Sequence, residues 1–358
     1  MDRATIDVYE QESARYEARR RPRFLPQAEA LGRRRPSGVA VDLGCGPGWY
    51  TAALGAPVVA LDGAMAMVRR TREVATGCLP VQADLAALPF RRGALAAGWA
   101  RNTYLHLRQD EVPMACNDLH HALVPDAPIE VTLLAGDDDE GYQLFPDEDL
   151  PGRWFSMWAD ERIRDVLHGA GFVVDELCRD GRGDDDPAFT VRARRAPTLP
   201  DFVASGMRLL VCGLNPSVHA ATAGVGYVTP GNRFWPAALT AGLVTRDRDG
   251  RHALREHGVG MTDLVKRATP RAAELTGEEY RSGLERLHRL CAWLRPAAVC
   301  FVGLAGWRAA VDRRAGPGWQ PQDVGGRPAY VMPSTSGLNA ATPLPVLVDH
   351  LRAAALGP

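Results

Sequence analysis

The sequence has little of what membrane, secreted or metal-cluster proteins need. No apolar run approaches the roughly 18 residues of a membrane span, and residues 1–20 contain no apolar signal core. The seven cysteines are odd in number and scattered, without a Cys-x-x-Cys pair. This argues against disulfides and against a cysteine-held metal or iron–sulfur cluster. We therefore expect a cytoplasmic protein that binds no metal and has no membrane partner.

Lysine is also almost absent, because Lys266 is the only one among 42 basic residues. The composition is otherwise that of a globular protein, with 358 residues and 46% hydrophobic residues, which predicts two domains with proper cores. Residues 1–196 hold 24 basic and 31 acidic side chains, and residues 197–358 hold 18 and 12. Only the second half therefore favours a polyanion, although such a surplus is also ordinary for a cytosolic domain.

Short apolar runs that end in Gly or Asp alternate with helical patterns, which is typical of buried parallel strands in an α/β fold. The runs cover residues 38–43, 58–61, 81–83, 95–100 and 129–134, and then 208–213, 297–303 and 329–332. A polar stretch that ends near Pro197 separates the two sets. We therefore predict two α/β domains, 1–197 and 198–358.

In the first half, one strand runs into a glycine-rich turn that contains Gly44 and Gly46. Glycines there let the backbone approach a ligand closely. Asp62 follows the next strand, where a carboxylate can accept ribose hydroxyls, and Asp84 follows the third, where it can meet an adenine amino group. Each aspartate alone could be a helix cap, but the three-strand pattern favours a nucleotide site.

These residues resemble the class I S-adenosylmethionine-dependent methyltransferases over about residues 5–195, including a final helix and hairpin. The resemblance implies a Rossmann-like sheet with S-adenosylmethionine as cofactor, Asp42 near its methionine end and Leu85 near its adenine. The implied cofactor-binding residues are Asp42, Gly44, Gly46, Asp62, Asp84 and Leu85.

The methyl acceptor is not specified. Residues 102–104 read Asn-Thr-Tyr and lack the Pro-Pro pair of amino methyltransferases that act on DNA bases, and the chain has no Pro-Cys nucleophile. We expect a small-molecule or nucleoside acceptor. Tyr104 and His106 are either acceptor-pocket residues or ordinary packing between strand and helix.

In the second half, residues 213–217 read Gly-Leu-Asn-Pro-Ser and follow an apolar strand. Pro216 keeps Asn215 out of helical geometry, so that its amide projects from the carboxyl end of the strand, where α/β sheets bind ligands. An amide can accept from and donate to one water, but it is not a base. Asn-Pro can also be a simple turn.

Two later loops add polar and aromatic groups. Tyr227 precedes a Pro-Gly-Asn-Arg-Phe-Trp stretch that enters a helix, and Leu338 follows Gly337 in a Ser-Thr-Ser-Gly-Leu-Asn loop. An apolar residue on a glycine tip can wedge into a base stack. The alternative is a helix-start loop in which Leu338 is a hydrophobic staple.

The order and spacing of these segments, with residues 258–265, resemble the mismatch-specific uracil/thymine-DNA glycosylases of the uracil-DNA glycosylase superfamily. The resemblance covers about residues 205–352 and implies an α/β/α sandwich. It also implies hydrolysis of the glycosidic bond of uracil or thymine in double-stranded DNA with G:U or G:T mispairs, with Asn215 as the catalytic residue that positions water. The implied substrate-binding residues are Leu214, Tyr227, Asn232, Ser334, Ser336, Gly337, Leu338 and Asn339.

The same resemblance assigns roles to these residues. Leu338, with its neighbours Gly337 and Asn339, would fill the vacated base stack, and Tyr227 would stack on the flipped base. Backbone N–H groups of Leu214 and Tyr227 would bind the pyrimidine, and the two serines would contact flanking phosphates. The enzyme would be monofunctional and need no cofactor, because no lysine in these segments can form a Schiff base.

The sequence departs from the family at Ser217, where many relatives carry glycine, at Leu338, where some carry arginine, and at Ala340, where others carry a basic residue. The change at Ala340 weakens the expected contact to the opposite guanine, so the preference between uracil and thymine is left open. We take Lys266 for a helix-flank or phosphate contact. A nucleoid-associated location would follow from DNA repair, whereas the alternative is a mispair-binding module attached to an idle methyltransferase scaffold.

Overall fold

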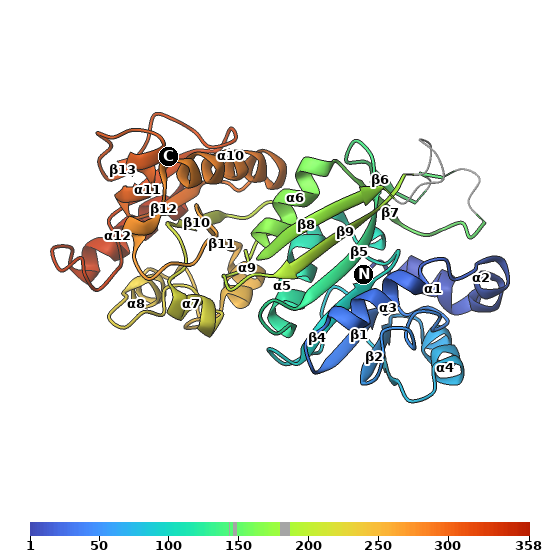
Figure 1. The fold of residues 1–358 in the computed structure, drawn as a ribbon. Helices are drawn as coiled ribbons and strands as arrows, with labels where there is room; N and C mark the ends of the chain where they lie inside the picture. The colour runs from blue at the N-terminus through green and yellow to red at the C-terminus, as the bar shows by residue number, and fades with distance from the viewer. Residues whose placement is uncertain (143, 146–148, 180–186) are drawn as a thin grey trace. The chain divides into compact units, whose positions relative to one another are not determined.

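The computed structural model describes residues 1–142, 144–145, 149–179 and 187–358, and the chain divides into two compact units (Figure 1). The first unit comprises residues 1–168 and 172–196, and the second comprises residues 169–171 and 197–358. Within the described ranges, no helix is long and apolar enough to cross a membrane.

The first unit is built on one large sheet. Its strands are β1 (Val39–Leu43), β2 (Val58–Asp62), β3 (Leu79–Gln82), β4 (Leu95–Ala100), β5 (Pro128–Ala135), β6 (Glu140–Gly141), β7 (Phe155–Trp158), β8 (Phe172–Arg179) and β9 (Ala188–Arg195). Its helices are α1 (Arg3–Gln11), α2 (Ser13–Arg19), α3 (Leu25–Arg34), α4 (Met65–Val74), α5 (Val112–Ala122) and α6 (Asp160–Gly169), with 3₁₀ turns at Tyr104–His106 and Gln109–Glu111.

The order of the strands in this sheet reverses beside β1. The order is β3-β2-β1-β4-β5-β7-β6, with β9 pairing antiparallel to β5 and β8 to β9. Consecutive strands proceed outward in one direction from β1 to β3 and in the other from β4 onward, so the topology switches between β1 and β4, where open α/β sheets bind ligands. Helix α4 packs on β2 and β3, and α3 packs on β4 and β5.

The second unit is smaller and mostly parallel. Its strands are β10 (Leu209–Gly213), β11 (Val259–Asp263), β12 (Val299–Val302), β13 (Gly318–Trp319) and β14 (Ala329–Met332). Its helices are α7 (Val218–Ala223), α8 (Phe234–Thr240), α9 (Gly250–His257), α10 (Gly277–Leu294), α11 (Leu304–Ala310) and α12 (Leu344–Leu356), with a 3₁₀ turn at Ala272–Glu274.

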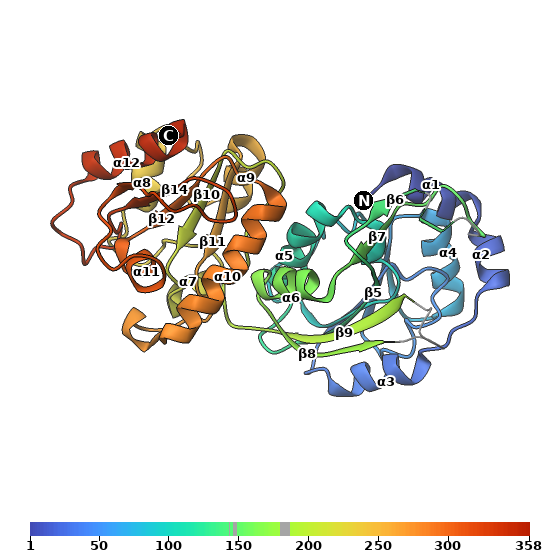
Figure 2. The same cartoon turned by 90° about the horizontal axis from the view of Figure 1, so that it is seen from above.

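Both faces of this second sheet are covered by helices. The strand order is β11-β10-β12-β14-β13, and only β13 is antiparallel to its neighbour. Alternate residues of β10, such as Leu209 and Val211, enter one core with α8, α9 and α12, while α11 packs beneath β12 and β14 (Figure 2). The predicted α/β fold class is therefore confirmed for both units.

Candidate functional site

A cavity of about 180 Å³ lies at the carboxyl ends of β10, β11 and β12 in the second unit. The sequence-predicted residues that line it are Leu214, Asn215, Tyr227, Asn232, Ser334 and Ser336. Gly337, Leu338 and Asn339 follow these serines in the adjoining loop but do not line the cavity. Six of the nine predicted residues therefore meet around one space.

The Asn215 side chain is held in one orientation. Its Nδ2 donates to Thr269 Oγ1 at 2.8 Å, Arg267 O at 3.0 Å and Pro216 O at 3.2 Å. Because carbonyl oxygens only accept, the NH₂ group must face them. Oδ1 has no hydrogen-bond partner within the part of the chain that the structure describes. The Nδ2 donors of Asn215 are therefore occupied by protein acceptors, which leaves Oδ1 as the atom of this amide that can bind a further partner.

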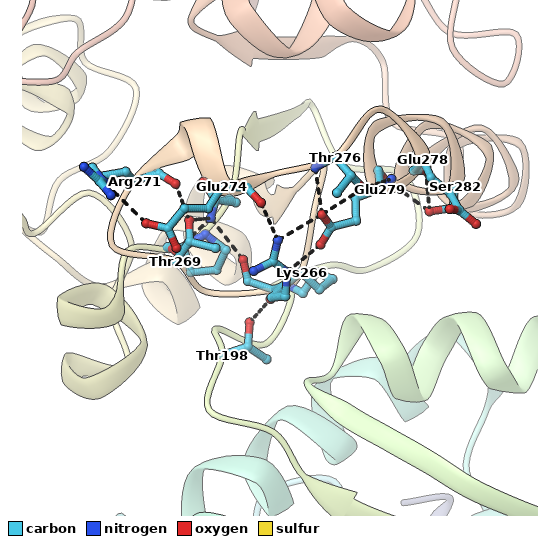
Figure 3. Close-up of polar contacts among 12 residues, drawn as sticks. Thr198, Lys266, Thr269, Arg271, Glu274, Thr276, Glu278, Glu279 and Ser282 are labelled. Carbon is cyan, nitrogen blue, oxygen red and sulfur yellow. Dashed lines mark hydrogen bonds and ion pairs between the residues drawn. The ribbon is translucent and has the colours of Figure 1, made fainter.

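The segment after β11 fixes the groups that hold this amide (Figure 3). Arg267 Nε donates to Glu279 Oε1 at 2.6 Å, and its Nη2 donates to Glu274 O at 2.8 Å. Thr276 and Glu279 form a capping box at the start of α10. Thr269 donates its hydroxyl to Arg271 O at 3.0 Å, which leaves its oxygen to accept from the amide. The Asn215 amide is therefore preorganised by its neighbours.

Asp263, to which the sequence analysis gave no role, also lines this cavity. It ends β11 in register with Gly213 of β10, and within the described residues its carboxylate has no hydrogen-bond partner. Burial raises its pKa to about 6, although the nearby Lys266 acts in the opposite direction. A Cβ on Gly213 would collide with this carboxylate, so only glycine fits there.

Tyr227 supplies an aromatic wall. Its ring stacks on that of Phe234 with centroids 4.1 Å apart, and its backbone has a φ of 59°, which is uncommon for a bulky residue. Trp235 Nε1 donates to Gly226 O at 2.9 Å and fixes the preceding turn. The backbone N–H groups of Leu214 and Tyr227 have no acceptor among the described residues and are available to a ligand.

The loop beyond the cavity presents Leu338 to solvent with 97% of its side chain exposed. Its interpretation as a hydrophobic staple is therefore wrong. Arg233 stiffens the loop by donating to Asn339 O at 2.6 Å and Ser336 O at 3.3 Å. The hydroxyls of Ser334 and Ser336 each accept a backbone N–H of the same loop, at 3.2 and 3.3 Å.

Two predicted binding residues use their amides for local structure. Asn232 Oδ1 accepts from Phe234 N at 2.9 Å and closes the turn that leads into α8. Asn339 Nδ2 donates to Ser334 O at 2.8 Å and to Thr342 Oγ1 at 3.1 Å. Both side chains therefore shape the two loops that flank the cavity.

Lys266 is neither a helix-flank residue nor exposed to phosphate. Its Nζ lies 2.7 Å from Asp201 Oδ1, and Arg286 Nη1 lies 2.8 Å from Asp201 Oδ2, all three side chains being buried. Burial alone would raise the pKa of Asp201, but the two cations hold it below its usual value. This buried triad anchors the end of β11, next to the cavity.

In the first unit, a small cavity of about 50 Å³ lies at the carboxyl ends of β1 and β2. The sequence-predicted residues that line it are Gly44, Gly46, Asp62 and Leu85. Asp62 accepts from Gly46 N at 3.0 Å and Ala64 N at 2.9 Å, and burial raises its pKa to about 6. Gly44 packs against Thr103 with no room for a Cβ, whereas a Cβ on Gly46 would meet only Tyr16 Cε1, 4.0 Å away.

The other two predicted carboxylates lie off this cavity. Asp42 is buried and accepts from Thr51 Oγ1 at 2.7 Å, and burial raises its pKa to about 7. Asp84 accepts from Ala86 N at 2.8 Å and from the amino group of Met1 at 2.8 Å. In this structure, the Asp42 side chain therefore links β1 to Thr51 and does not face the cavity.

Helices α1 and α2, which the sequence analysis did not include in the site, close over it through Tyr9 and Tyr16. Glu17 of α2 is bound to Arg70 of α4, with Nη2 and Oε1 2.8 Å apart. A pair of adjacent amphipathic helices has no sequence pattern that predicts a cover over a binding site. Only the position of α1 and α2 beside the strand ends shows this role.

His106 and Tyr104 have different environments. The Tyr104 side chain is buried between strand and helix as part of the core, whereas the His106 side chain lines the cavity. His106 Nδ1 lies 2.6 Å from Trp154 O, so it carries the proton, and Tyr9 Oη then donates to Nε2 at 2.8 Å. Arg153 donates to Tyr9 Oη at 2.6 Å. Burial lowers the pKa of His106 to about 3, which keeps its ring neutral.

Comparison with known families identifies both units. Residues 200–352 match the model of the uracil DNA glycosylase superfamily, and residues 40–126 match that of a methyltransferase domain. The chain therefore contains one domain of each kind, which confirms both resemblances at this level. The assignment to the mismatch-specific branch stays a prediction.

Solved structures similar to this chain include several methyltransferases. The CcbJ methyltransferase from Streptomyces caelestis is 17% identical, with 55% of this chain and 100% of that chain covered and a TM-score of 0.44. The 1,6-didemethyltoxoflavin-N1-methyltransferase of Burkholderia thailandensis, solved with S-adenosylhomocysteine, is 16% identical over 54% of this chain and 88% of that one, with a TM-score of 0.42.

Proposed function

We propose that the second unit is a monofunctional DNA glycosylase that removes uracil mispaired with guanine. The observation that carries this proposal is the Asn215 amide, whose donors are all occupied and whose Oδ1 is left for a water in a cavity beside an exposed leucine. A base inside a duplex must be flipped out before its sugar carbon can be reached, at a cost of a few kcal/mol that is least at a mispair.

Each residue around the cavity has its own role in the proposed reaction. Leu338 enters the vacated stack, Tyr227 covers the flipped base, and the free N–H groups at Leu214 and Tyr227 bind the pyrimidine and the negative charge it gains on leaving. A water that donates to Asn215 Oδ1 and to the Asp263 carboxylate directs its lone pair at C1′. The C1′–N bond breaks with its electrons going to the base, the water oxygen bonds to C1′, and its proton passes to Asp263.

Excision from labelled duplexes tests the proposal. The full chain is incubated in EDTA with G:U, A:U and G:T duplexes and with single-stranded uracil DNA, and alkali reveals abasic sites. We expect repeated turnover at G:U, slower excision at A:U and single-stranded uracil, and slow or absent excision at G:T. Tight binding of the G:U duplex without any excision would contradict the proposal and favour a mispair-binding module.

We also propose that the first unit is an S-adenosylmethionine-dependent methyltransferase. These residues suit this cofactor, because Asp62 keeps unused lone pairs at the end of β2 and the backbone at Gly46 faces the cavity beneath Tyr16 with no side chain of its own. Asp62 would hold the ribose, Leu85 would contact the adenine, and the backbone around Gly46 would lie along the methionine part. When bound, the cofactor supplies an electrophilic methyl group.

Replacing Asp62 by alanine is expected to weaken S-adenosylmethionine binding at least tenfold, because two ribose hydrogen bonds to a charged acceptor are lost. Isothermal titration of the full chain measures the effect, with circular dichroism to check the fold and Asp62→Asn to preserve the backbone contacts partly. Asp175→Ala removes an exposed carboxylate of β8 and is the control. Unchanged affinity in Asp62→Ala would remove Asp62 from the site.

A further inference from the structure

A second and larger cavity, of about 680 Å³, adjoins the cofactor-side cavity of the first unit. Both cavities are lined by Tyr16, Gly44, Gly46, Arg101 and Asn102. A volume in this range suits a small organic molecule. The larger cavity therefore adjoins the proposed cofactor site and has room for a methyl acceptor.

The described lining of this cavity is strongly basic. It includes five arginines and no aspartate or glutamate, although residues 1–196 as a whole are acidic. Arg20 is paired with Asp149 at 2.6 Å, and Arg21 donates to backbone carbonyls of α2. Arg19 and Arg23 have no acidic partner within the described residues. Among the described residues, no carboxylate therefore compensates these two positive charges in the cavity lining.

Aromatic rings form the rest of the wall. Trp49 stacks on Tyr16 with centroids 5.8 Å apart and planes 19° apart, and Tyr50 lies beside them. The Arg101 guanidinium lies 3.3 Å from the centroid of the Phe24 ring and donates to Thr132 Oγ1 at 2.8 Å. Flat apolar surface next to the guanidinium groups of Arg19 and Arg23 selects a ligand that is flat and anionic.

We infer that this cavity binds the methyl acceptor and that the acceptor is a small planar aromatic molecule that carries a carboxylate or a phosphate. The inference rests on the proposed methyltransferase function. Arg19 and Arg23 bind the anionic group, and the aromatic wall positions the ring so that its nucleophilic atom faces the cofactor. That atom bonds to the transferred methyl group, the sulfonium–methyl bond breaks toward sulfur, and the proton of the nucleophile leaves to solvent.

Isothermal titration of the full chain saturated with S-adenosylhomocysteine tests the inference with phenyl phosphate, benzoate and neutral benzamide. We expect phenyl phosphate or benzoate to bind at least tenfold more tightly than benzamide, and the stronger of the two identifies the anionic group. Arg19→Gln and Arg23→Gln should each weaken that anion about tenfold and leave S-adenosylhomocysteine affinity unchanged. Arg72→Gln, on exposed α4 surface away from the cavity, should change neither.

Other outcomes overturn the inference in distinguishable ways. Equal binding of benzamide and the anions, or anion binding unaffected by both substitutions, would refute the anionic acceptor while the cofactor site stands. If Arg19→Gln and Arg23→Gln weaken duplex DNA tenfold but not the small anions, the arginines form a DNA-binding surface and the inference is wrong. Failure of S-adenosylhomocysteine to bind the unaltered chain would instead refute the proposed methyltransferase function.

Discussion

Replacing Asn215 by alanine is expected to lower the single-turnover rate of uracil excision at G:U about a hundredfold to a thousandfold. The amide is anchored through Nδ2 to Thr269 and Arg267, and in the proposed mechanism its Oδ1 directs the water at the sugar carbon. Alanine leaves that water without an acceptor on this side. Quenched excision with enzyme in excess over labelled G:U duplex measures the effect.

Affinity separates this role from a structural one. Because Oδ1 binds the water and not the base, the Kd of Asn215→Ala for an uncleaved G:U duplex should stay within about threefold of that of the unaltered chain. Thr269→Val keeps Asn215 but removes one anchor, and we expect an intermediate loss of about tenfold in rate. A loss of affinity equal to the loss of rate in Asn215→Ala would contradict the positioning role.

Asn215→Asp is not expected to produce a faster enzyme, although a carboxylate is a stronger acceptor. The Asn215 amide faces the carbonyl oxygens of Pro216 and Arg267. A carboxylate there would place negative charge against two acceptors, which costs free energy and turns the side chain away. The surrounding segment thus selects asparagine over aspartate at this position.

The strands with continuous apolar runs could be predicted from the sequence, because burial on both faces requires such runs. The buried β1, β4, β10 and β12 are examples. Strand β11 was missed, since it combines Gly260 and Thr262 with apolar residues and pairs only at the edge of its sheet. Missing β11 also hid Asp263, whose importance depends on the register that places it beside Gly213.

Site residues, like strands, could be predicted only where the local sequence determines their environment. Residues in loops with restrictive chemistry, such as Asn215 before proline and Leu338 after glycine, could be predicted to project from the fold. The environment of Asp42 and Lys266 depends on partners far away in the sequence, Thr51 in one case and Asp201 in the other. No local pattern reports such contacts, so their burial was not foreseen.

Asp263→Asn is expected to reduce excision about a hundredfold above pH 7, because it removes the group that takes the proton of the water in the proposed mechanism. Burial raises the pKa of Asp263 to about 6, so that the carboxylate needed for catalysis forms only as pH rises through that value. For the unaltered chain, the rate of excision should therefore rise tenfold per pH unit below about pH 6 and level off above it. The rate of Asp263→Asn should show no such inflection.

The same substitution should stabilise the second unit at neutral pH. The folded-state pKa of about 6 lies above the usual 3.8, so the folded chain binds this proton more tightly, and the free energy of unfolding falls as pH rises between these values. Asparagine cannot ionise, so the free energy of unfolding of Asp263→Asn does not fall in this way as pH rises. Above pH 7, Asp263→Asn should exceed the unaltered chain by on the order of 2–3 kcal/mol, and below pH 4 the difference should vanish.

Two comparisons make this result specific to Asp263. Asp247→Asn alters an exposed carboxylate and should change neither rate nor stability. Asp201→Asn leaves Lys266 and Arg286 buried without their shared anion and should destabilise the unit by about 3–5 kcal/mol. If Asp263→Asn is less active but more stable than the unaltered chain, the Asp263 carboxylate serves catalysis although its burial destabilises the fold. If Asp263→Asn instead loses stability at pH 7 as Asp201→Asn does, then Asp263 is structural and the proposed proton acceptor is wrong.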